Sequence, residues 1–297
     1  MSARQSITPP APVTVIGLGN MGIPMALRLA KAGFQVTGFD ISEASRQKFS
    51  AAGGRAVANG IEAVKSADVV ITLLPDGKAV RAALEPLRKG FKPGCILIDM
   101  SSSEPLGTRA LGGSFIAAGF AFIDAPVSGG VRRAADGTLA IMAGGDAATI
   151  DRVEPVLAAM GRAIFRTGGL GSGHTMKALN NYVSAAGLIA AVEAIEIGRK
   201  FGLDPNLMAD IFNASTGRNN TTEVKLKQFI ISGSFNAGFP LRLMAKDVRT
   251  ADRLGHEIGV PVPFADACAE LWDGAAEALD AAADHTEIGR YIETLKA

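Results

Sequence analysis

The feature that most constrains the fold is a change in sequence pattern near Gly168. From Val13 to about Gly168, short β-branched or apolar runs alternate with helix-like stretches, which is the pattern of βαβ units around a parallel sheet. Beyond this point the β-rich runs stop, and helical patterns of Ala, Leu and Glu continue to the C-terminus. The chain has 297 residues, which favours two domains over one core. We therefore predict a doubly wound α/β domain over residues 13–169 and an all-helical domain over 170–297.

The predicted elements can be stated by range. Strands are expected at 13–17, 35–40, 68–74, 95–99, 121–124, 139–143 and 163–166. One long helix should join the domains, from about His174 to Phe201, and further helices are expected from Pro205, at 241–254, at 264–279 and at 287–295. Residues 1–12 carry three prolines and no apolar run, so we expect a disordered leader rather than a signal peptide.

The composition argues against several classes of partner. Lys and Arg number 30 against 29 Asp and Glu, without blocks of like charge, so neither nucleic acid nor an anionic membrane is indicated. The longest apolar stretch, 182–192, is shorter than the roughly 20 residues that a membrane-spanning helix needs. The two cysteines and the histidines His174, His256 and His285 show no metal-ligand spacing, so no metal is expected. A reducing, cytoplasmic location is expected.

A glycine motif follows the first predicted strand and opens a predicted helix. Its first glycine, Gly17, allows a tight turn, Gly19 lets a pyrophosphate approach the backbone, and Gly22 lets helix and strand pack closely. The alternative is a glycine-rich turn of the kind found in any α/β protein. We predict that the whole loop contacts a dinucleotide: Gly17, Leu18, Gly19, Asn20, Met21 and Gly22.

The end of the second predicted strand favours the dinucleotide interpretation. Asp40 stands 18 residues beyond Gly22, where a carboxylate can accept hydrogen bonds from both adenosine ribose hydroxyls. The same carboxylate repels a 2′-phosphate, so NAD is expected in preference to NADP. Arg46, a turn or two further on, is the residue that leaves NADP open.

Two further strand ends point to the same edge of the sheet. Leu74 and Pro75 follow the third predicted strand, and Ser102 follows the fourth. In open α/β sheets, ligands bind beyond the carboxyl ends of the strands. We therefore predict cofactor contacts at these residues, although each segment alone is also what an ordinary loop looks like.

Three segments compete to supply the chemistry of a reaction: the Ser128 loop, the start of the long helix, and Lys246 with Asp247 in a later helix. The Ser128 hydroxyl, with the N–H groups of Gly129 and Gly130, can hold a carboxylate. Lys177 and Asn181 are four residues apart on the long helix and so project to one face, with His174 a turn earlier. A desolvated lysine can accept a hydroxyl proton at neutral pH because burial lowers a lysine pKa. A solvated lysine is the alternative, but the flanking residues are apolar.

These motifs, in this order, resemble the β-hydroxyacid dehydrogenase family, which includes 3-hydroxyisobutyrate dehydrogenase and tartronate semialdehyde reductase. The resemblance covers nearly all of 13–296 and rests on the glycine loop, the segment 124–130, the segment from Gly171 to Asn181, and Lys246 with Asp247. It implies a Rossmann domain joined by a long helix to an all-helical domain, and a homodimer or homotetramer.

The resemblance also implies residue roles. Lys177 would be the general acid/base, the Ser128 loop would hold the substrate carboxylate, Asn181 would position the substrate, and Lys246 would line the nicotinamide side. The expected reaction is reversible hydride transfer between NAD and a small 3-hydroxy acid such as 3-hydroxyisobutyrate, or its semialdehyde. The alternatives are reduction of another aldehyde acid, such as tartronate semialdehyde or sulfolactaldehyde, and a non-catalytic NAD-binding scaffold.

Overall fold

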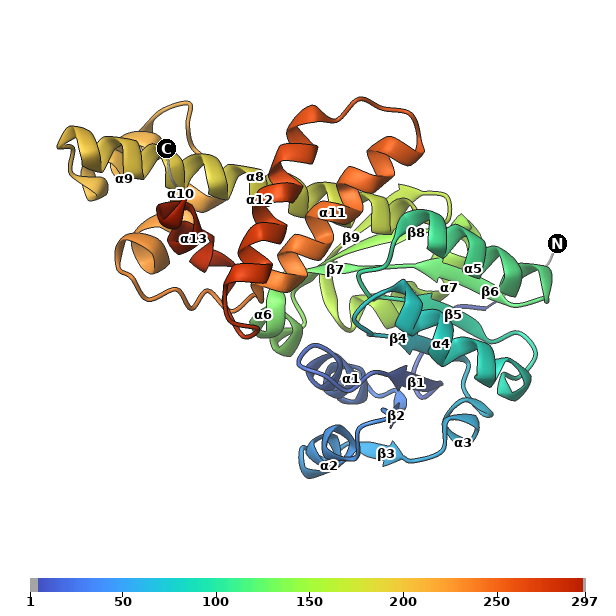
Figure 1. The fold of residues 1–297 in the computed structure, drawn as a ribbon. Helices are drawn as coiled ribbons and strands as arrows, with labels where there is room; N and C mark the ends of the chain where they lie inside the picture. The colour runs from blue at the N-terminus through green and yellow to red at the C-terminus, as the bar shows by residue number, and fades with distance from the viewer. Residues whose placement is uncertain (1–4, 296–297) are drawn as a thin grey trace. The chain divides into compact units, whose positions relative to one another are not determined.

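The computed structural model describes residues 5–295 and divides the chain into two compact units, Met1–Lys177 and Ala178–Ala297. The first unit holds one sheet in the order β3-β2-β1-β4-β5-β6-β8-β7, with β9 paired to β8 (Figure 1). Its strands are β1 (Pro12–Ile16), β2 (Gln35–Phe39), β3 (Arg55–Val57), β4 (Val69–Thr72), β5 (Ile96–Asp99), β6 (Ala121–Asp124), β7 (Val127–Ser128), β8 (Leu139–Gly144) and β9 (Gly161–Gly168).

The six strands from β3 to β6 are parallel, as the sequence predicts. Beyond them, β8 pairs antiparallel with β6 and β7 and parallel with β9. The helices of this unit are α1 (Gly22–Lys31), α2 (Glu43–Ala51), α3 (Gly60–Val64), α4 (Gly77–Leu87), α5 (Pro105–Ala117), α6 (Gly130–Asp136) and α7 (Ala147–Ala158), with a short 3-10 helix at Arg88–Gly90. The predicted α/β class is confirmed, while β3 and β7 were not predicted because each is three residues or fewer.

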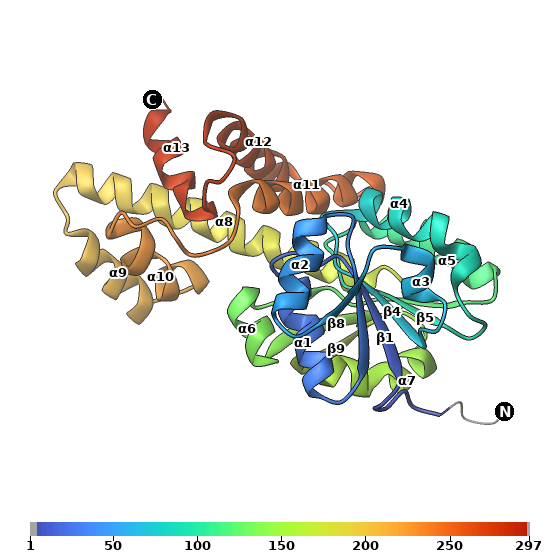
Figure 2. The same cartoon turned by 90° about the horizontal axis from the view of Figure 1, so that it is seen from below.

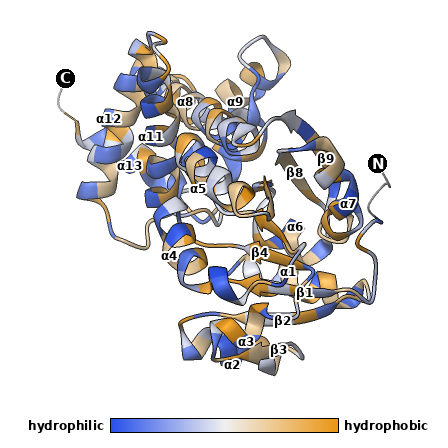
Figure 3. Cartoon of the chain, turned by 90° about the vertical axis from the view of Figure 1, so that its right-hand side faces the viewer, coloured by the Kyte–Doolittle hydropathy of each residue, from blue (hydrophilic) through white to orange (hydrophobic). Residues whose placement is uncertain are grey.

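Both faces of the sheet are covered by helices, which explains its continuous apolar strands. Side chains alternate along each strand, so Ile71 packs in a cluster with residues of α1 and α7, while the adjacent Val70 packs with residues of α4 and α5 (Figure 2). The central strands β1 and β4 are coloured as hydrophobic in Figure 3. The carboxyl ends of these strands therefore form a rigid edge on which loops can present ligand-binding groups.

The second unit is helical, as predicted. It continues α8 (Ser172–Phe201) and adds α9 (Pro205–Ala214), α10 (Asn220–Val224), a π-helix (Leu226–Ile231), α11 (Leu241–Glu257), α12 (Pro263–Ala278), a 3-10 helix (His285–Glu287) and α13 (Ile288–Thr294). Asp204 caps α9 and Pro205 is its first residue, as predicted. The core of this unit includes Leu188, Val192 and Trp272.

Helix α8 is, among the described residues, the one helix that is long and apolar enough to cross a bilayer by length and composition. Its Leu188, Val192 and Ile195 are instead buried in the core of the helical unit. Burial in this core thus explains part of the hydropathy of α8.

The structure corrects the predicted leader where it describes it. Residues 1–4 lie outside the described residues. In the described part, the Ile7 N–H donates to the Arg152 carbonyl at 2.7 Å, and the side chains of Ile7 and Ala11 pack against the sheet core. Residues from Ile7 onward therefore follow a defined course along this unit, because Ile7 has apolar surface to bury.

The division between the units lies inside α8 rather than before it, at Lys177 instead of residue 169. The reason is a buried carboxylate at the end of β6. Asp124 accepts hydrogen bonds from the backbone N–H groups of Gly171, at 2.7 Å, and His174, at 2.8 Å. These bonds satisfy N–H groups at the helix start that have no partner within the helix, and they join the first turns of α8 to the sheet.

The close approach of α8 to the sheet requires glycine at position 173. A Cβ atom on Gly173 would collide with the Met142 carbonyl oxygen and lie 2.9 Å from the Asp124 carboxylate. We predict that Gly173→Ala lowers the free energy of unfolding by about 1–3 kcal/mol, the usual cost of overpacking, as measured by urea denaturation. Gly169→Ala is the matched control, because a Cβ atom there meets nothing within 4 Å. Equal stability of the two variants would contradict this account.

Candidate functional site

The glycine loop between β1 and α1 has the backbone shape that a dinucleotide site needs. Gly17 has a φ of +98°, and a Cβ atom on it would collide with the Leu73 carbonyl oxygen. A Cβ atom on Gly22 would collide with the Gly17 carbonyl oxygen, so this helix start is packed directly on the loop. Gly19 differs, because nothing lies within 4 Å of its Cβ position. The backbone there is open to a ligand, and the N-terminus of α1 favours an anionic one.

Asp40, at the end of β2, contacts this loop directly. Its carboxylate accepts hydrogen bonds from the Leu18 N–H at 2.7 Å and the Ser42 N–H at 2.7 Å, one on each oxygen. Each oxygen keeps capacity for a further donor, such as a ribose hydroxyl. Arg46 Nη1 donates to the carbonyl oxygens of Asp40, at 2.6 Å, and Ile41, at 3.1 Å. Arg46 is the residue that kept NADP as an alternative cofactor. Its guanidinium is therefore hydrogen-bonded to the backbone of the same turn.

The loops after β4 and β5 lie together at the same edge of the sheet. The Leu74 N–H donates to the Ser101 hydroxyl at 3.0 Å, which places Leu74 and Pro75 beside the segment that contains Ser102. Beneath them the buried Asp99 carboxylate accepts hydrogen bonds from the Thr72 hydroxyl, at 2.9 Å, and the Ser103 hydroxyl, at 2.8 Å. The predicted cofactor residues of this unit are thus gathered on the loops that follow β1, β2, β4 and β5.

The Ser128 loop follows β6 and ends at α6. Ser128 is half-buried, while Gly129 and Gly130 are exposed. Both glycines have positive φ values, +134° and +69°, which other residues rarely adopt. The Cβ position of Gly130 meets nothing within 4 Å, so its backbone is open to a ligand.

His174 is buried at the start of α8 and connects this helix to α5 and to the carboxyl ends of β5 and β6. Its Nδ1 lies 2.9 Å from the Thr108 hydroxyl, and its Nε2–H donates to the Ser101 carbonyl at 3.1 Å. The ring also lies between two buried carboxylates, 3.8 Å from Asp99 and 3.7 Å from Asp124. Burial raises the pKa of Asp124, although the charge of His174 and the N–H groups of His174 and Gly171 oppose the rise. Lys177 is one helical turn further along the chain and half-buried.

The helical unit holds a second group of predicted residues. Asn181 is buried, and its Nδ2 donates to Asp247 Oδ2 at 2.5 Å. The other oxygen of Asp247 lies 3.1 Å from the ammonium of Lys246, its neighbour on α11. Asn180 Nδ2 donates to Asn181 Oδ1 at 3.1 Å. Asp247 therefore fixes both predicted residues, Asn181 and Lys246, in one buried polar group.

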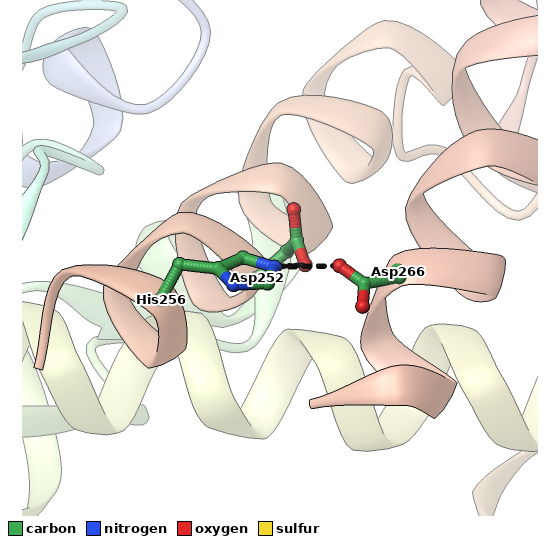
Figure 4. A group of neighbouring side chains, drawn as sticks. All are labelled: Asp252, His256 and Asp266. Carbon is green, nitrogen blue, oxygen red and sulfur yellow. Dashed lines mark hydrogen bonds and ion pairs between the residues drawn. The ribbon is translucent and has the colours of Figure 1, made fainter. Parts of the chain in front are cut away.

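A third cluster lies outside these groups, between α11 and α12 (Figure 4). His256 Nε2 is 2.6 Å from Asp266 Oδ1 and 3.6 Å from Asp252 Oδ1, and the ligand atoms all lie within 4.8 Å of one another. The spacing of His and Cys residues does not reveal this cluster, because two of its three members are aspartates. The hydrogen bond with Asp266 raises the pKa of His256, and the same bond lowers the pKa of Asp266.

The raised pKa of His256 and the lowered pKa of Asp266 make the stability of the fold depend on pH. A histidine whose pKa is raised in the folded state stabilises the fold below its unfolded pKa of about 6.5. This stabilisation is lost as the pH rises through the folded-state pKa. An aspartate whose pKa is lowered in the folded state stabilises the fold above its unfolded pKa of about 4. This stabilisation is lost as the pH falls through the folded-state pKa. We therefore predict that His256→Gln lowers the melting temperature at pH 6 and that this difference shrinks by pH 9. Asp266→Asn should do the same, and a difference independent of pH would contradict the ion pair. The effect should be small, because the His256 side chain is 56% exposed.

Residues that sequence reasoning missed are those fixed by contacts distant in sequence. Asp99, Asp124 and Asp247 were not assigned a role at the site, and His174 was ranked below Lys177. Buried carboxylates directly after strands are a signal that could have found the first two, because a buried charge needs partners. No local signal indicates that Asp247 contacts Asn181, 66 positions away.

Known proteins match this chain along most of its length. Residues 12–169 match the family described as the NAD binding domain of 6-phosphogluconate dehydrogenase, and residues 171–292 match the NAD-binding family of NADP-dependent 3-hydroxyisobutyrate dehydrogenase. A 2-(hydroxymethyl)glutarate dehydrogenase of Eubacterium barkeri is 35% identical over 87% of each chain. A NAD-dependent L-serine dehydrogenase of Pseudomonas aeruginosa is 34% identical over 88% of this chain and 90% of its own.

A solved structure shows the same fold along the whole chain. The 3-hydroxyisobutyrate dehydrogenase of Mycobacterium tuberculosis, determined with L-serine, has a TM-score of 0.90 and 32% identity, and the match covers 96% of this chain and 99% of that one. The two family matches, these relatives and this structure show that the chain belongs to the β-hydroxyacid dehydrogenase family.

Proposed function

We propose that the protein is an NAD-dependent dehydrogenase that catalyses reversible hydride transfer between NAD and a small 3-hydroxy acid. The observation that carries the proposal is the arrangement of side chains along α8. The start of this helix is hydrogen-bonded to the buried Asp124 carboxylate through His174, and Lys177 and Asn181 follow on one helix face. The open backbone at Gly19 and the Asp40 carboxylate fit the pyrophosphate and ribose of NAD.

The residues supply a complete set of roles for the oxidation. The unprotonated Lys177 amine takes the hydroxyl proton as the C–O bond becomes a carbonyl, and it returns this proton in the reverse direction. Bound NAD supplies the hydride acceptor. The hydroxyl of Ser128 and the N–H groups of Gly129 and Gly130 hold the substrate carboxylate. Asn181, fixed by Asp247, positions the substrate, and Lys246 lines the nicotinamide side.

The relatives differ in substrate, and 3-hydroxyisobutyrate, L-serine and 2-(hydroxymethyl)glutarate are all 3-hydroxy acids with different groups on C2. Their shared part, a carboxylate two carbons from a primary alcohol, is what the Ser128 loop and Lys177 would recognise. Reduction of tartronate semialdehyde or sulfolactaldehyde uses the same groups in the reverse direction. A non-catalytic scaffold would need neither Lys177 nor the Ser128 loop.

Self-association and location follow from the same proposal. Several apolar side chains of α8 and α9 are more than half exposed, which supports a homodimer or homotetramer formed through the helical unit. They are Val183, Ile197, Phe201, Leu207 and Ile211. Light scattering of the purified protein gives its molar mass, and a monomer would contradict this point. We expect a cytoplasmic protein with no nucleic-acid or membrane partner, which fractionation of cells tests.

The first test is Lys177→Ala. Loss of a general acid/base usually lowers turnover about 10²- to 10⁴-fold, so we expect a kcat reduced by that factor. NAD affinity, measured by fluorescence titration, should stay within about threefold, because Lys177 acts on the substrate. Lys200→Ala is the matched control, since Lys200 is exposed near the end of the same helix. A variant at position 177 that kept the wild-type kcat on its best substrate would refute the assigned role.

The second test concerns the cofactor. The wild-type protein should have a higher kcat/KM with NAD than with NADP, because the Asp40 carboxylate repels a 2′-phosphate. Asp40→Ser should lower kcat/KM with NAD and narrow the preference by roughly 10-fold, the scale of one or two charged hydrogen bonds. Glu43→Gln, which changes an exposed carboxylate of the same turn, should leave the ratio unchanged. A wild-type preference for NADP would overturn this interpretation.

A further inference from the structure

A buried lysine of the helical unit has no role in the reaction described above. Lys225 lies between α10 and the π-helix and is only 9% exposed. Lysine is rarely buried unless it is paired, because the charged form loses its hydration. Across residues 5–295 no carboxylate lies within 4 Å of its ammonium, and its hydrogen bond is to a neutral group, the Ser184 hydroxyl, at 3.3 Å.

The hydrogen bond to Ser184 places Lys225 beside the helix that carries Lys177 and Asn181. Ser184 follows Asn181 by three residues and Lys177 by seven on α8, so all three side chains belong to one face of the helix. Neighbours at this spacing are about 5–6 Å apart between Cβ atoms. Ser184 is half-buried, and a small molecule bound at Asn181 would lie within about one helical turn of it.

The segment that carries Lys225 is held firmly in place. Asn219 caps α10 by accepting hydrogen bonds from the Thr221 and Thr222 N–H groups, and its side chain lies against Gly187, one turn beyond Ser184. The carbonyl of Lys225 accepts from both Phe229 and Ile230 where the π-helix begins. Wide turns of this kind often occur at functional sites.

The charge of Lys225 has not been removed by burial. Desolvation lowers its pKa to about 8, although the charge of Asp284 opposes the fall, so most molecules still carry an ammonium at pH 7. An ammonium has three donors, and Ser184 accepts one of them. Two donors remain for a ligand, and an anionic ligand would offset the cost of burying the charge.

We propose that Lys225, together with Ser184, binds a second anionic group on the substrate, so that the preferred substrates are 3-hydroxy acids whose C2 substituent ends in a carboxylate or sulfonate. The inference rests on the proposed function and specifies its substrate class. An arm of two methylenes and a carboxyl carbon spans about 4 Å at C–C bonds of about 1.5 Å, which suits the step from Asn181 to Ser184.

The test uses three substrates and four proteins. The substrates are 2-(hydroxymethyl)glutarate, 2-(hydroxymethyl)-5-methylhexanoate, which keeps the C1 carboxylate but has an uncharged arm of similar size, and 3-hydroxyisobutyrate, which lacks the arm. The proteins are the wild type, Lys225→Met, Lys225→Arg and the control Lys227→Met. Lys227 is a suitable control because it is two residues away, exposed, and paired with Asp210 at 2.6 Å. Circular dichroism and thermal melting verify that each variant is folded.

The wild type should favour the diacid over the monoacid with the uncharged arm by roughly 10- to 100-fold in kcat/KM, the scale of a charged hydrogen bond. Lys225→Met should remove this preference while changing kcat/KM for 3-hydroxyisobutyrate by less than about threefold. Lys225→Arg should retain part of the preference, and Lys227→Met should behave as the wild type. An equal loss on all three substrates, or a wild type that favours the monoacid with the uncharged arm, would overturn the proposal.

A failure of the proposed function gives a different result. In that case the wild type reduces no NAD with any of the three substrates. Lys225 is then judged by calorimetric titration of the diacid into the NAD-loaded wild type and Lys225→Met. Binding that depends on the lysine supports an anion site there, whereas equal binding or none to both proteins overturns it.

Discussion

The hydrogen bonds from Gly171 and His174 to the Asp124 carboxylate are the interaction on which the candidate site depends. A helix start has N–H groups without partners, and a buried carboxylate has oxygens without water, so each satisfies the other. Glycine at 173 lets the two approach, and the His174 ring adds contacts to Thr108 and Ser101. Lys177, one turn later, is therefore carried by a helix whose beginning is fixed to the sheet.

Much of the fold could be predicted from sequence because its causes are local. The strands at 69–72 and 96–99 are continuous apolar runs, as a sheet covered on both faces requires, and Asp204 and Pro205 mark the start of α9. Short elements escaped this reasoning. A three-residue edge strand and a π-helix have no periodicity long enough to detect, and the apolar side chain of Ile7 was hidden among prolines.

Some residues of the candidate site could likewise be predicted from the sequence, whereas their contacts could not. Glycines and the strand-end Asp40 were recognisable because a backbone shape dictates the residue type. The partners of buried polar groups were not recognisable, because they depend on which loops the fold brings together. Asp247 contacts Asn181 across 66 positions, and Lys225 contacts Ser184 across 41. In the local sequence, neither Asp247 within α11 nor Lys225 between two short helices differs from a residue on a solvated surface.

Helix α8 explains why such distant contacts converge on a few residues. Positions 174, 177, 181 and 184 recur at spacings of three, four and three, which is the repeat of one helix face. The partners known for this face differ along its length: carboxylates of the sheet unit at His174, Asp247 at Asn181, and a cation at Ser184. A change of substrate among relatives can then arise beyond Asn181 without disturbing the anchored start. In the proposed function, the chemistry at Lys177 and the choice of substrate at Ser184 are separated along one helix, so that each can vary while the other is kept.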